Sequence, residues 1–244
     1  MLFRDAWAIA IDKPAGLAVQ GGSGQNRPLD HLLGALAAPG QETPRLVHRL
    51  DRDTSGVLLL GASQHATRAL AAAFKQRSAR KVYLAIVAGR LDKPHGRIDL
   101  PLAKGRPGEG RGEGRELMTV ARDGEEAVTL YATAQVTGDG KASLLALSPL
   151  TGRTHQLRVH LAHLGHPILG DGKYGGRQAH PPLRGLPGQL LLHARELAVP
   201  HPEDGTTLRV EAPLPPHFVQ ALKALGLEER RVERALEELE KRGL

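Results

Sequence analysis

Residues 47–61 read Val-His-Arg-Leu-Asp-Arg-Asp-Thr-Ser-Gly-Val-Leu-Leu-Leu-Gly, a dense polar segment that runs directly into an apolar one. The apolar run over residues 57–60, bounded by glycines, is typical of a strand that is buried on both faces. An acidic residue among arginines at the start of such a strand is partly desolvated, which is costly unless an arginine pairs with it. The segment therefore predicts either an ionised carboxylate in a basic pocket or a salt-bridged turn that stabilises the start of the strand.

The segments on both sides of this strand alternate irregularly between strand and helix patterns. Strands are predicted over residues 7–11, 82–89, 128–136, 142–147, 190–192, 197–199 and 207–211. Helices are predicted over residues 29–38, after a cap at Ser63, and from a cap at Thr154 to a stop at Gly165, with Leu157, Leu161 and Leu164 on one face. Because strands outnumber helices without regular interleaving, we expect an α+β fold with a mixed, mostly antiparallel central sheet flanked by helices and loops.

Length and charge give a first outline of the chain. Its 244 residues suffice for one large domain or two small ones, and we expect a main domain over residues 1–227 and a charged helix over residues 228–244. That helix has five basic and six acidic residues, so the net charge of +7 for the chain becomes +8 for residues 1–227. A basic main domain indicates a polyanionic partner. The helix has a narrow apolar stripe that suits packing on the main domain better than a dedicated partner.

Several classes of function are disfavoured by composition. Cysteine is absent, which excludes disulfides, thiolate catalysis and iron–sulfur clusters and favours a cytoplasmic location. We expect no membrane span and no signal peptide. The four histidines between residues 155 and 166 lack the spacing of a helical metal site, and residues 170–176 lack that of a phosphate-binding loop, so no metal and no nucleotide cofactor are expected. The seven scattered aromatics argue against a platform that stacks several bases.

Residues 48–56 resemble the His-Arg-Leu-Asp-x-x-Thr-Ser-Gly signature of the RluA family of pseudouridine synthases. Other segments are similar to the remaining family motifs in the same order. These are residues 13–17 (Lys-Pro-Ala-Gly-Leu) for the first motif, 80–85 for the tyrosine motif, 151–158 for the third motif, and then 165–171, 174–175, 192–194 and 201–202. The matches extend over residues 7–202. We therefore favour membership of this family over the simpler interpretation, in which residues 47–56 form only a salt-bridged turn.

The resemblance implies an RNA pseudouridine synthase that isomerises specific uridines in structured ribosomal or transfer RNA. Such an enzyme flips the target nucleotide, cleaves the N1–C1′ bond, turns the uracil and joins C5 to C1′. No redox step is involved, which agrees with the absence of a cofactor motif. Because the first motif begins by residue 13, we expect residues 1–227 to form the catalytic domain without a separate N-terminal RNA-binding domain. A compact stem-loop is the expected target, and a monomer without an obligate protein partner is the default.

The resemblance also assigns catalytic residues. Asp51 takes the place of the essential aspartate, which could attack C1′, add to uracil C6, or abstract a proton through a glycal intermediate. The resemblance implies Arg158 as its ion-pair partner, because an ionised carboxylate in such a site needs a nearby cation. Tyr83 matches the tyrosine that stacks on the target base, although without the resemblance a strand tyrosine in the core would be the simpler interpretation.

Four further residues are expected to bind substrate: Arg49, Leu157, His48 and Arg153. The resemblance implies that Leu157 lines the uracil pocket. Arg49 either handles the flipped nucleotide, filling its vacated place, or contacts a phosphate. The Gly- and Arg-rich stretch over residues 105–115 predicts a loop inserted within the domain, which either stays solvated or folds onto RNA.

Two other functions deserve comparison. A non-catalytic RNA-binding or folding factor could share the fold, but it would have no chemical reason to keep Asp51, Tyr83 and Arg158 together. A glycosidase that uses Asp51 and Asp53 as paired carboxylates is disfavoured, because residues two apart in an extended segment point in opposite directions. That interpretation also leaves the other motifs unexplained.

Overall fold

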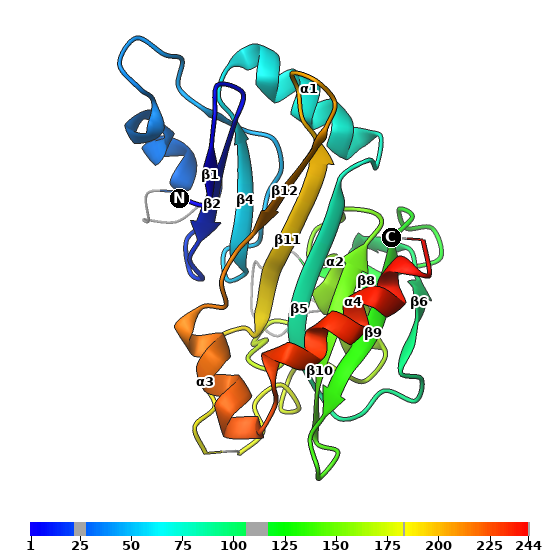
Figure 1. Ribbon diagram of the computed structural model, residues 1–244. Helices are drawn as coiled ribbons and strands as arrows, with labels where there is room; N and C mark the ends of the chain where they lie inside the picture. Colours follow the sequence, from blue (N-terminus) through cyan, green and yellow to red (C-terminus); the bar gives the residue numbers. More distant parts are fainter. Residues whose placement is uncertain (22–27, 106–116, 183, 244) are drawn as a thin grey trace. The chain divides into compact units, whose positions relative to one another are not determined.

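The computed structural model describes residues 1–21, 28–105, 117–182 and 184–243 (Figure 1). The chain divides into two compact units. The first unit contains Met1–Tyr83 and Leu192–Pro215, and the second contains Leu84–Leu191 and Pro216–Leu244. The Gly- and Arg-rich stretch predicted as a loop falls, apart from Gly105, outside the described residues.

The first unit is built around one central strand, β4. Its elements are β1 (Phe3–Arg4), β2 (Ala8–Lys13), the 3₁₀ helix η1 (Leu29–Leu36), β3 (Arg45–Leu46), β4 (Ser55–Gly61), α1 (Gln64–Lys75), β11 (Leu192–Pro200) and β12 (Thr207–Glu211). β2 pairs antiparallel with the whole length of β4, from Ala8 opposite Gly61 to Lys13 opposite Gly56. On the other edge of β4, β3 pairs with its end and β11 runs parallel to its beginning.

Both faces of β4 are covered, as the uninterrupted apolar run predicted. Side chains alternate along a strand, so Leu58 and Leu60 pack on one side with a cluster that includes Leu33 of η1. Val57 and Leu59 pack on the other side with a cluster that includes Leu70 of α1. All seven residues of β4 are buried. The strand is therefore a rigid support for the polar segment that precedes it.

Helix α1 begins where the sequence predicted. The hydroxyl oxygen of Ser63 accepts a hydrogen bond from the Ala66 N–H at 3.2 Å, which satisfies one of the N–H groups left unpaired at a helix start. The helix predicted over residues 29–38 is instead a 3₁₀ helix without a side-chain cap.

The second unit holds the remaining strands and helices. They are β6 (His95–Asp99), β7 (Leu102–Lys104), β8 (Met118–Val120), β9 (Val128–Val136), β10 (Ala142–Pro149), α2 (Gln156–His163), α3 (Pro216–Leu225), the 3₁₀ helix η2 (Glu229–Arg231) and α4 (Val232–Glu240). β5 (Arg80–Ala88) begins in the first unit and ends in the second. β9 and β10 form the predicted antiparallel hairpin, and β6 pairs antiparallel with the outer edge of β9. The predicted mostly antiparallel α+β fold is confirmed.

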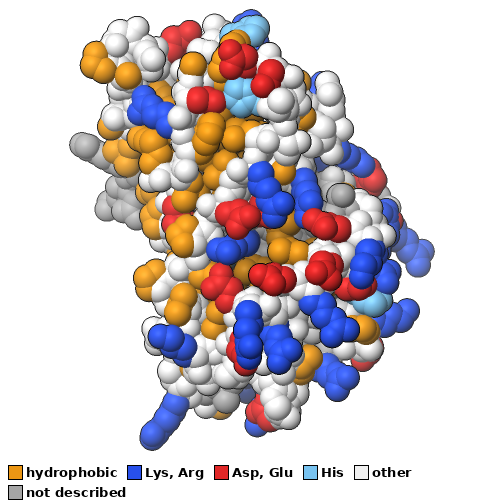
Figure 2. All heavy atoms as spheres, viewed as in Figure 1, with side chains coloured by type: hydrophobic (Ala, Val, Ile, Leu, Met, Phe, Trp, Pro, Cys, Tyr) orange, Lys and Arg blue, Asp and Glu red, His pale blue; other side chains and the backbone are white. Residues whose placement is uncertain are grey.

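In the segment predicted as a charged helix over residues 228–244, the structure has η2 followed by α4. α4 lies across β9 and β10 and buries Val232 and Leu239, whereas Leu236 is only half-buried (Figure 1). Ala235, which the predicted stripe omitted, is buried as well. Acidic and basic side chains are interspersed on the visible surface around this helix (Figure 2), in keeping with its near-neutral charge.

Three local predictions were wrong. Thr154 does not cap α2, because His155 occupies the N-cap in a left-handed conformation with φ of 54°. Leu164 is 41% exposed and so does not share a buried face with Leu157 and Leu161, although the predicted stop is correct, since Gly165 follows the C-cap with φ of +81°. The two predicted strands over residues 190–192 and 197–199 are largely one strand, β11.

Candidate active site

The polar segment before β4 forms a tight turn that carries Asp51. The Thr54 N–H donates to the Asp51 carbonyl oxygen at 3.2 Å, which closes the turn over three residues. Arg52 pairs with Asp53, with Nε 3.0 Å from Oδ1, and both side chains are at least 40% exposed. An ion pair this exposed adds little stability. The predicted salt-bridged turn therefore exists, but the acid in this pair is Asp53 and not Asp51.

Lys13 ties this turn to the end of β2. Its side chain is fully buried, and its ammonium donates to three carbonyl oxygens: Pro14 at 2.8 Å, Leu17 at 3.0 Å and Arg52 at 2.9 Å. Burial lowers the pKa of Lys13 to about 8, although the nearby carboxylates of Asp53 and Asp51 favour the charged form. The sequence placed Lys13 in a motif without giving it a role. The structure shows that it supports the Asp51 turn.

His48 supports the same segment from the other side. Its ring stacks on Phe74 of α1, with centroids 4.6 Å apart, and its Nε2 accepts the Leu59 N–H at 2.9 Å. Leu59 is next to the two residues of β4 that pair with β3. The imidazole therefore takes up a β4 backbone N–H at the point where pairing with β3 ends. Burial, with a contribution from Lys81, lowers the pKa of His48 to about 3, so the ring is neutral. These contacts are structural, and the expected role of His48 in substrate binding stays a prediction.

Tyr83 lies beside the Asp51 turn. The tyrosine is partly buried and packs against the apolar cluster that contains Leu50 and Leu58. Burial raises the pKa of its hydroxyl, and the negative charge of Asp51 raises it further, so the phenol is neutral and electrostatically coupled to the aspartate. Arg49 is exposed, and its Nη1 lies 3.3 Å from Oε1 of Gln20. The first unit therefore brings together Asp51 and Tyr83, two of the three expected catalytic residues.

The start of β4 is held against β11 by a close backbone contact. Gly56 has φ of +110°, and a Cβ there would lie 2.2 Å from the Ala194 carbonyl oxygen. Next to it, Ser55 Oγ and His193 Nδ1 form a buried hydrogen bond of 2.9 Å. Only glycine allows this approach, because it has no side chain and adopts positive φ readily. The contact accounts for a matched segment, residues 192–194, that lies far from Asp51 in the sequence.

In the second unit, the third motif is anchored by a buried polar network. Thr151 Oγ1 donates to Gln156 Oε1 at 2.6 Å and accepts the Val128 N–H at 2.9 Å. Gln156 Nε2 donates to the Val128 carbonyl oxygen at 2.9 Å. The first turn of α2 is thereby joined to β9. Buried polar groups that are fully bonded in this way rigidify their surroundings, and this network precedes Leu157 and Arg158 directly.

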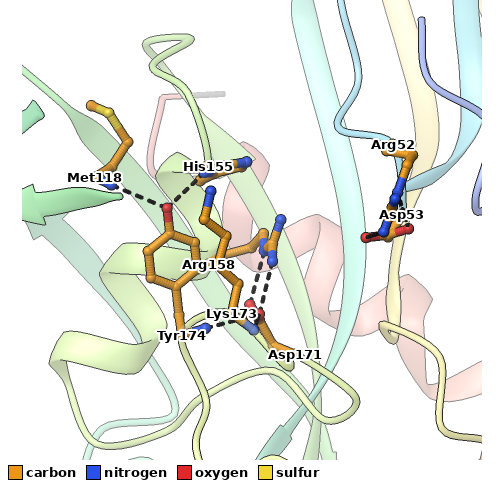
Figure 3. Close-up of polar contacts among 8 residues, drawn as sticks. All are labelled: Arg52, Asp53, Met118, His155, Arg158, Asp171, Lys173 and Tyr174. Carbon is orange, nitrogen blue, oxygen red and sulfur yellow. Dashed lines mark hydrogen bonds and ion pairs between the residues drawn. The ribbon is translucent and has the colours of Figure 1, made fainter. Parts of the chain in front are cut away.

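Arg158 is held by a second acid, Asp171. Its Nε and Nη2 each lie 2.8 Å from one carboxylate oxygen of Asp171, and the two side chains are only 7% and 1% exposed (Figure 3). Burial acts to raise the pKa of Asp171, but the hydrogen bonds and charge of Arg158 outweigh it and hold the pKa below its usual value. This pair could not be predicted from spacing, although Asp171 lies in a matched segment. Asp51 and Arg158 belong to different units, and their expected pairing stays a prediction.

The two other expected residues of this unit have contacts of their own. Leu157 is 6% exposed, in a part of α2 where residues 156–161 are all buried. The guanidinium of Arg153 pairs with the carboxylate of Glu125, and its Nε donates to the Glu126 carbonyl oxygen at 3.0 Å. Their roles toward substrate stay predictions.

Two further properties bear on function. Within residues 1–21, 28–105, 117–182 and 184–243, no group of three or more metal-ligating side chains gathers in one place. In the same part of the chain, every helix is too short or too polar to cross a bilayer.

Comparison with known proteins agrees with the architecture. A family model described as RNA pseudouridylate synthase matches residues 8–163. A ribosomal large subunit pseudouridine synthase C of Yersinia pestis is 39% identical over 226 residues, which cover 92% of this chain and 68% of the relative. Its counterpart in Escherichia coli is 36% identical over 229 residues, 92% of this chain and 69% of the relative.

Solved structures give the same result. The human protein RNA pseudouridylate synthase domain containing 4 is similar with a TM-score of 0.74 and 29% identity, over 93% of each chain. The chain therefore belongs to the RNA pseudouridylate synthases, and among them to the RluA family.

Proposed function

We propose that this enzyme isomerises specific uridines of structured ribosomal RNA to pseudouridine. The observation that carries the proposal is the 39% identity, over 92% of the chain, to a ribosomal large subunit pseudouridine synthase, together with an Asp51 turn that is supported from two sides. Transfer RNA is the alternative substrate. A compact stem-loop remains the expected target, and a cytoplasmic monomer the expected form.

In this proposal the reaction takes place at the flipped uridine. The N1–C1′ bond breaks, the uracil turns, the C5–C1′ bond forms, C5 loses its proton and N1 gains one. No electron donor or acceptor is required. Asp51 is the catalytic group, whether it attacks C1′, adds to C6 or removes a proton along a glycal route. Lys13 and the Thr54 N–H hold the backbone that presents it.

The other residues bind and orient. Tyr83 stacks on the target base with a neutral phenol, and Leu157 lines the uracil pocket. Arg158 is the cation that pairs with Asp51. Arg49 and Arg153, with His48 beside them in the motif, contribute to RNA binding, and the net charge of +8 over residues 1–227 favours contact with phosphates.

The test is chemical mapping of pseudouridine after incubation with unmodified transcripts of large-subunit ribosomal RNA and, in parallel, of transfer RNA. Wild-type protein should convert a small number of ribosomal sites, and Asp51→Asn should convert none. Conversion of transfer RNA alone would change the substrate class. The proposal fails if wild type converts neither RNA, or if Asp51→Asn converts as much as wild type, which would favour a non-catalytic RNA-binding factor.

A further inference from the structure

The side chain of Arg158 is enclosed by a group of residues that the reaction does not otherwise use. We call Asp171 and Tyr174 the Arg158 clamp. Asp171 contacts the guanidinium through both oxygens, and the Tyr174 ring centroid lies 5.1 Å from Cζ of Arg158 (Figure 3). A bidentate contact sets the plane of a guanidinium, and an aromatic face stabilises the cation on a second side.

The carboxylate of the clamp is itself held in place. Oδ1 of Asp171 accepts the backbone N–H groups of Lys173 at 2.9 Å and Tyr174 at 3.1 Å, in addition to Nη2 of Arg158. The residue is 1% exposed. Its orientation is thus set by its own backbone and not by the arginine alone.

The ring of the clamp is anchored at its hydroxyl end. The Tyr174 oxygen accepts the Met118 N–H at 3.2 Å and lies 2.6 Å from Nδ1 of His155. His155 has φ of 54°, which is uncommon for a residue with a side chain and costs free energy. The hydroxyl of Tyr174 is therefore held by Met118 of β8 and by His155 at the start of α2, while the face of its ring lies against Arg158.

Stability alone is a poor explanation for this arrangement. Burying a salt bridge costs desolvation, and a packed apolar group of similar size is often as stabilising or more so. The clamp does, however, hold one positive charge in one orientation. That is the property required of a cation that must orient a reactive carboxylate.

We propose that Asp171 is a positioning residue for the isomerisation, which acts by holding Arg158 with the help of Tyr174. The inference rests on the proposed function, in which Arg158 pairs with Asp51. Asp171 touches neither substrate nor reacting atoms. Its loss therefore affects the chemical step and leaves the affinity for RNA nearly unchanged.

The experiment compares Asp171→Asn and Asp171→Glu with wild type, measuring kcat, KM for RNA and the thermal unfolding midpoint. Asn keeps the shape but loses the charge, and we expect kcat to fall on the order of 100-fold, as for a misplaced catalytic group, with KM within threefold. Glu keeps the charge but displaces it by one methylene, so the kcat of Asp171→Glu should lie between those of wild type and Asp171→Asn.

A matched control is Glu196→Gln. Glu196 is another buried carboxylate, 2% exposed, that pairs with Arg209 at 2.7 Å in the first unit. It should lose stability comparably while kcat stays near that of wild type. Asp171→Asn with wild-type kcat, or a loss confined to KM, would overturn the inference, as would an equal fall of kcat in Glu196→Gln.

If Asp171→Asn does not fold, Asp171→Glu decides, and wild-type kcat in that variant overturns the inference. Wild type and Asp51→Asn are assayed beside these variants. An inactive wild type refutes the proposed function itself, whereas an active wild type with an equally active Asp171→Asn refutes only the role of Asp171.

Discussion

Replacing Lys13 by methionine tests how the Asp51 turn is supported. Methionine has a similar length but no donor, so the carbonyl oxygens of Pro14 and Leu17 lose the hydrogen bond from the ammonium, whereas that of Arg52 keeps the one from the Gly16 N–H. An acceptor left without a partner costs about 1–3 kcal/mol. We take the lower end for each, because burial of the ammonium is itself unfavourable, as its pKa of about 8 shows. The expected loss in the free energy of unfolding is then about 2 kcal/mol.

The assay is thermal unfolding followed by circular dichroism at pH 7. A loss of about 2 kcal/mol corresponds to a fall in Tm of roughly 4–8 °C for a chain of this size. The control is Lys141→Met, whose ammonium is 67% exposed and pairs with Asp139 at 3.2 Å, and which should change stability by less than about 1 kcal/mol. A Tm of Lys13→Met within 2 °C of wild type would mean a loss of about 1 kcal/mol or less in the free energy of unfolding. That result would refute the proposed support of the turn by Lys13.

Three more predictions follow from the same residues. Because the pKa of His48 is about 3 in the folded protein against an ordinary 6.5, the unfolded chain takes up the proton first as pH falls. Urea unfolding should therefore show a loss of up to about 3 kcal/mol between pH 7 and pH 4 that His48→Gln lacks, and parallel pH curves would contradict this. Gly56→Ala should cost on the order of 3 kcal/mol or more, because its Cβ would meet the Ala194 carbonyl oxygen, and should therefore lower Tm by about 6 °C or more. Gly16→Ala, with similar positive φ but open space around it, should cost only about 1–2 kcal/mol, and equal losses in the two variants would disprove the steric argument. Tyr83→Ala should reduce kcat/KM by about 10- to 100-fold, the worth of one stacked base, and a smaller loss in steady-state assays would argue against stacking.

Much of the fold could be predicted because its signals are local. The apolar run of β4 lies between glycines, the β9–β10 hairpin has a glycine-rich turn, and Ser63 stands one residue before α1. Each of these depends on neighbours within about ten positions. The cap of α2 was mispredicted because the start of this helix is held by Gln156, which bonds to Thr151 and to the distant strand β9, and not by a side-chain cap.

The site was predictable only in part for a related reason. Asp51 and Tyr83 were found through motifs, and the first unit brings them together. Asp171 was missed because its partnership with Arg158 depends on the path of the chain after α2, which no spacing rule gives. The contacts of His48 could not be predicted, because its ring partner, Phe74, comes from a later helix, and its expected role toward substrate stays a prediction.

The parallel pairing of β4 with β11 has a consequence for synthesis on the ribosome. Ser55 and His193, joined by a hydrogen bond, are 138 residues apart in the chain. The strand that follows the Asp51 turn therefore lacks one neighbour until nearly four-fifths of the polypeptide has been made. Contacts so distant in sequence form late and slow the search for the native state. A nascent chain thus emerges with Asp51 long before the backbone hydrogen bonds around it are complete. Truncated products should therefore be poor catalysts even when every motif before residue 190 is present.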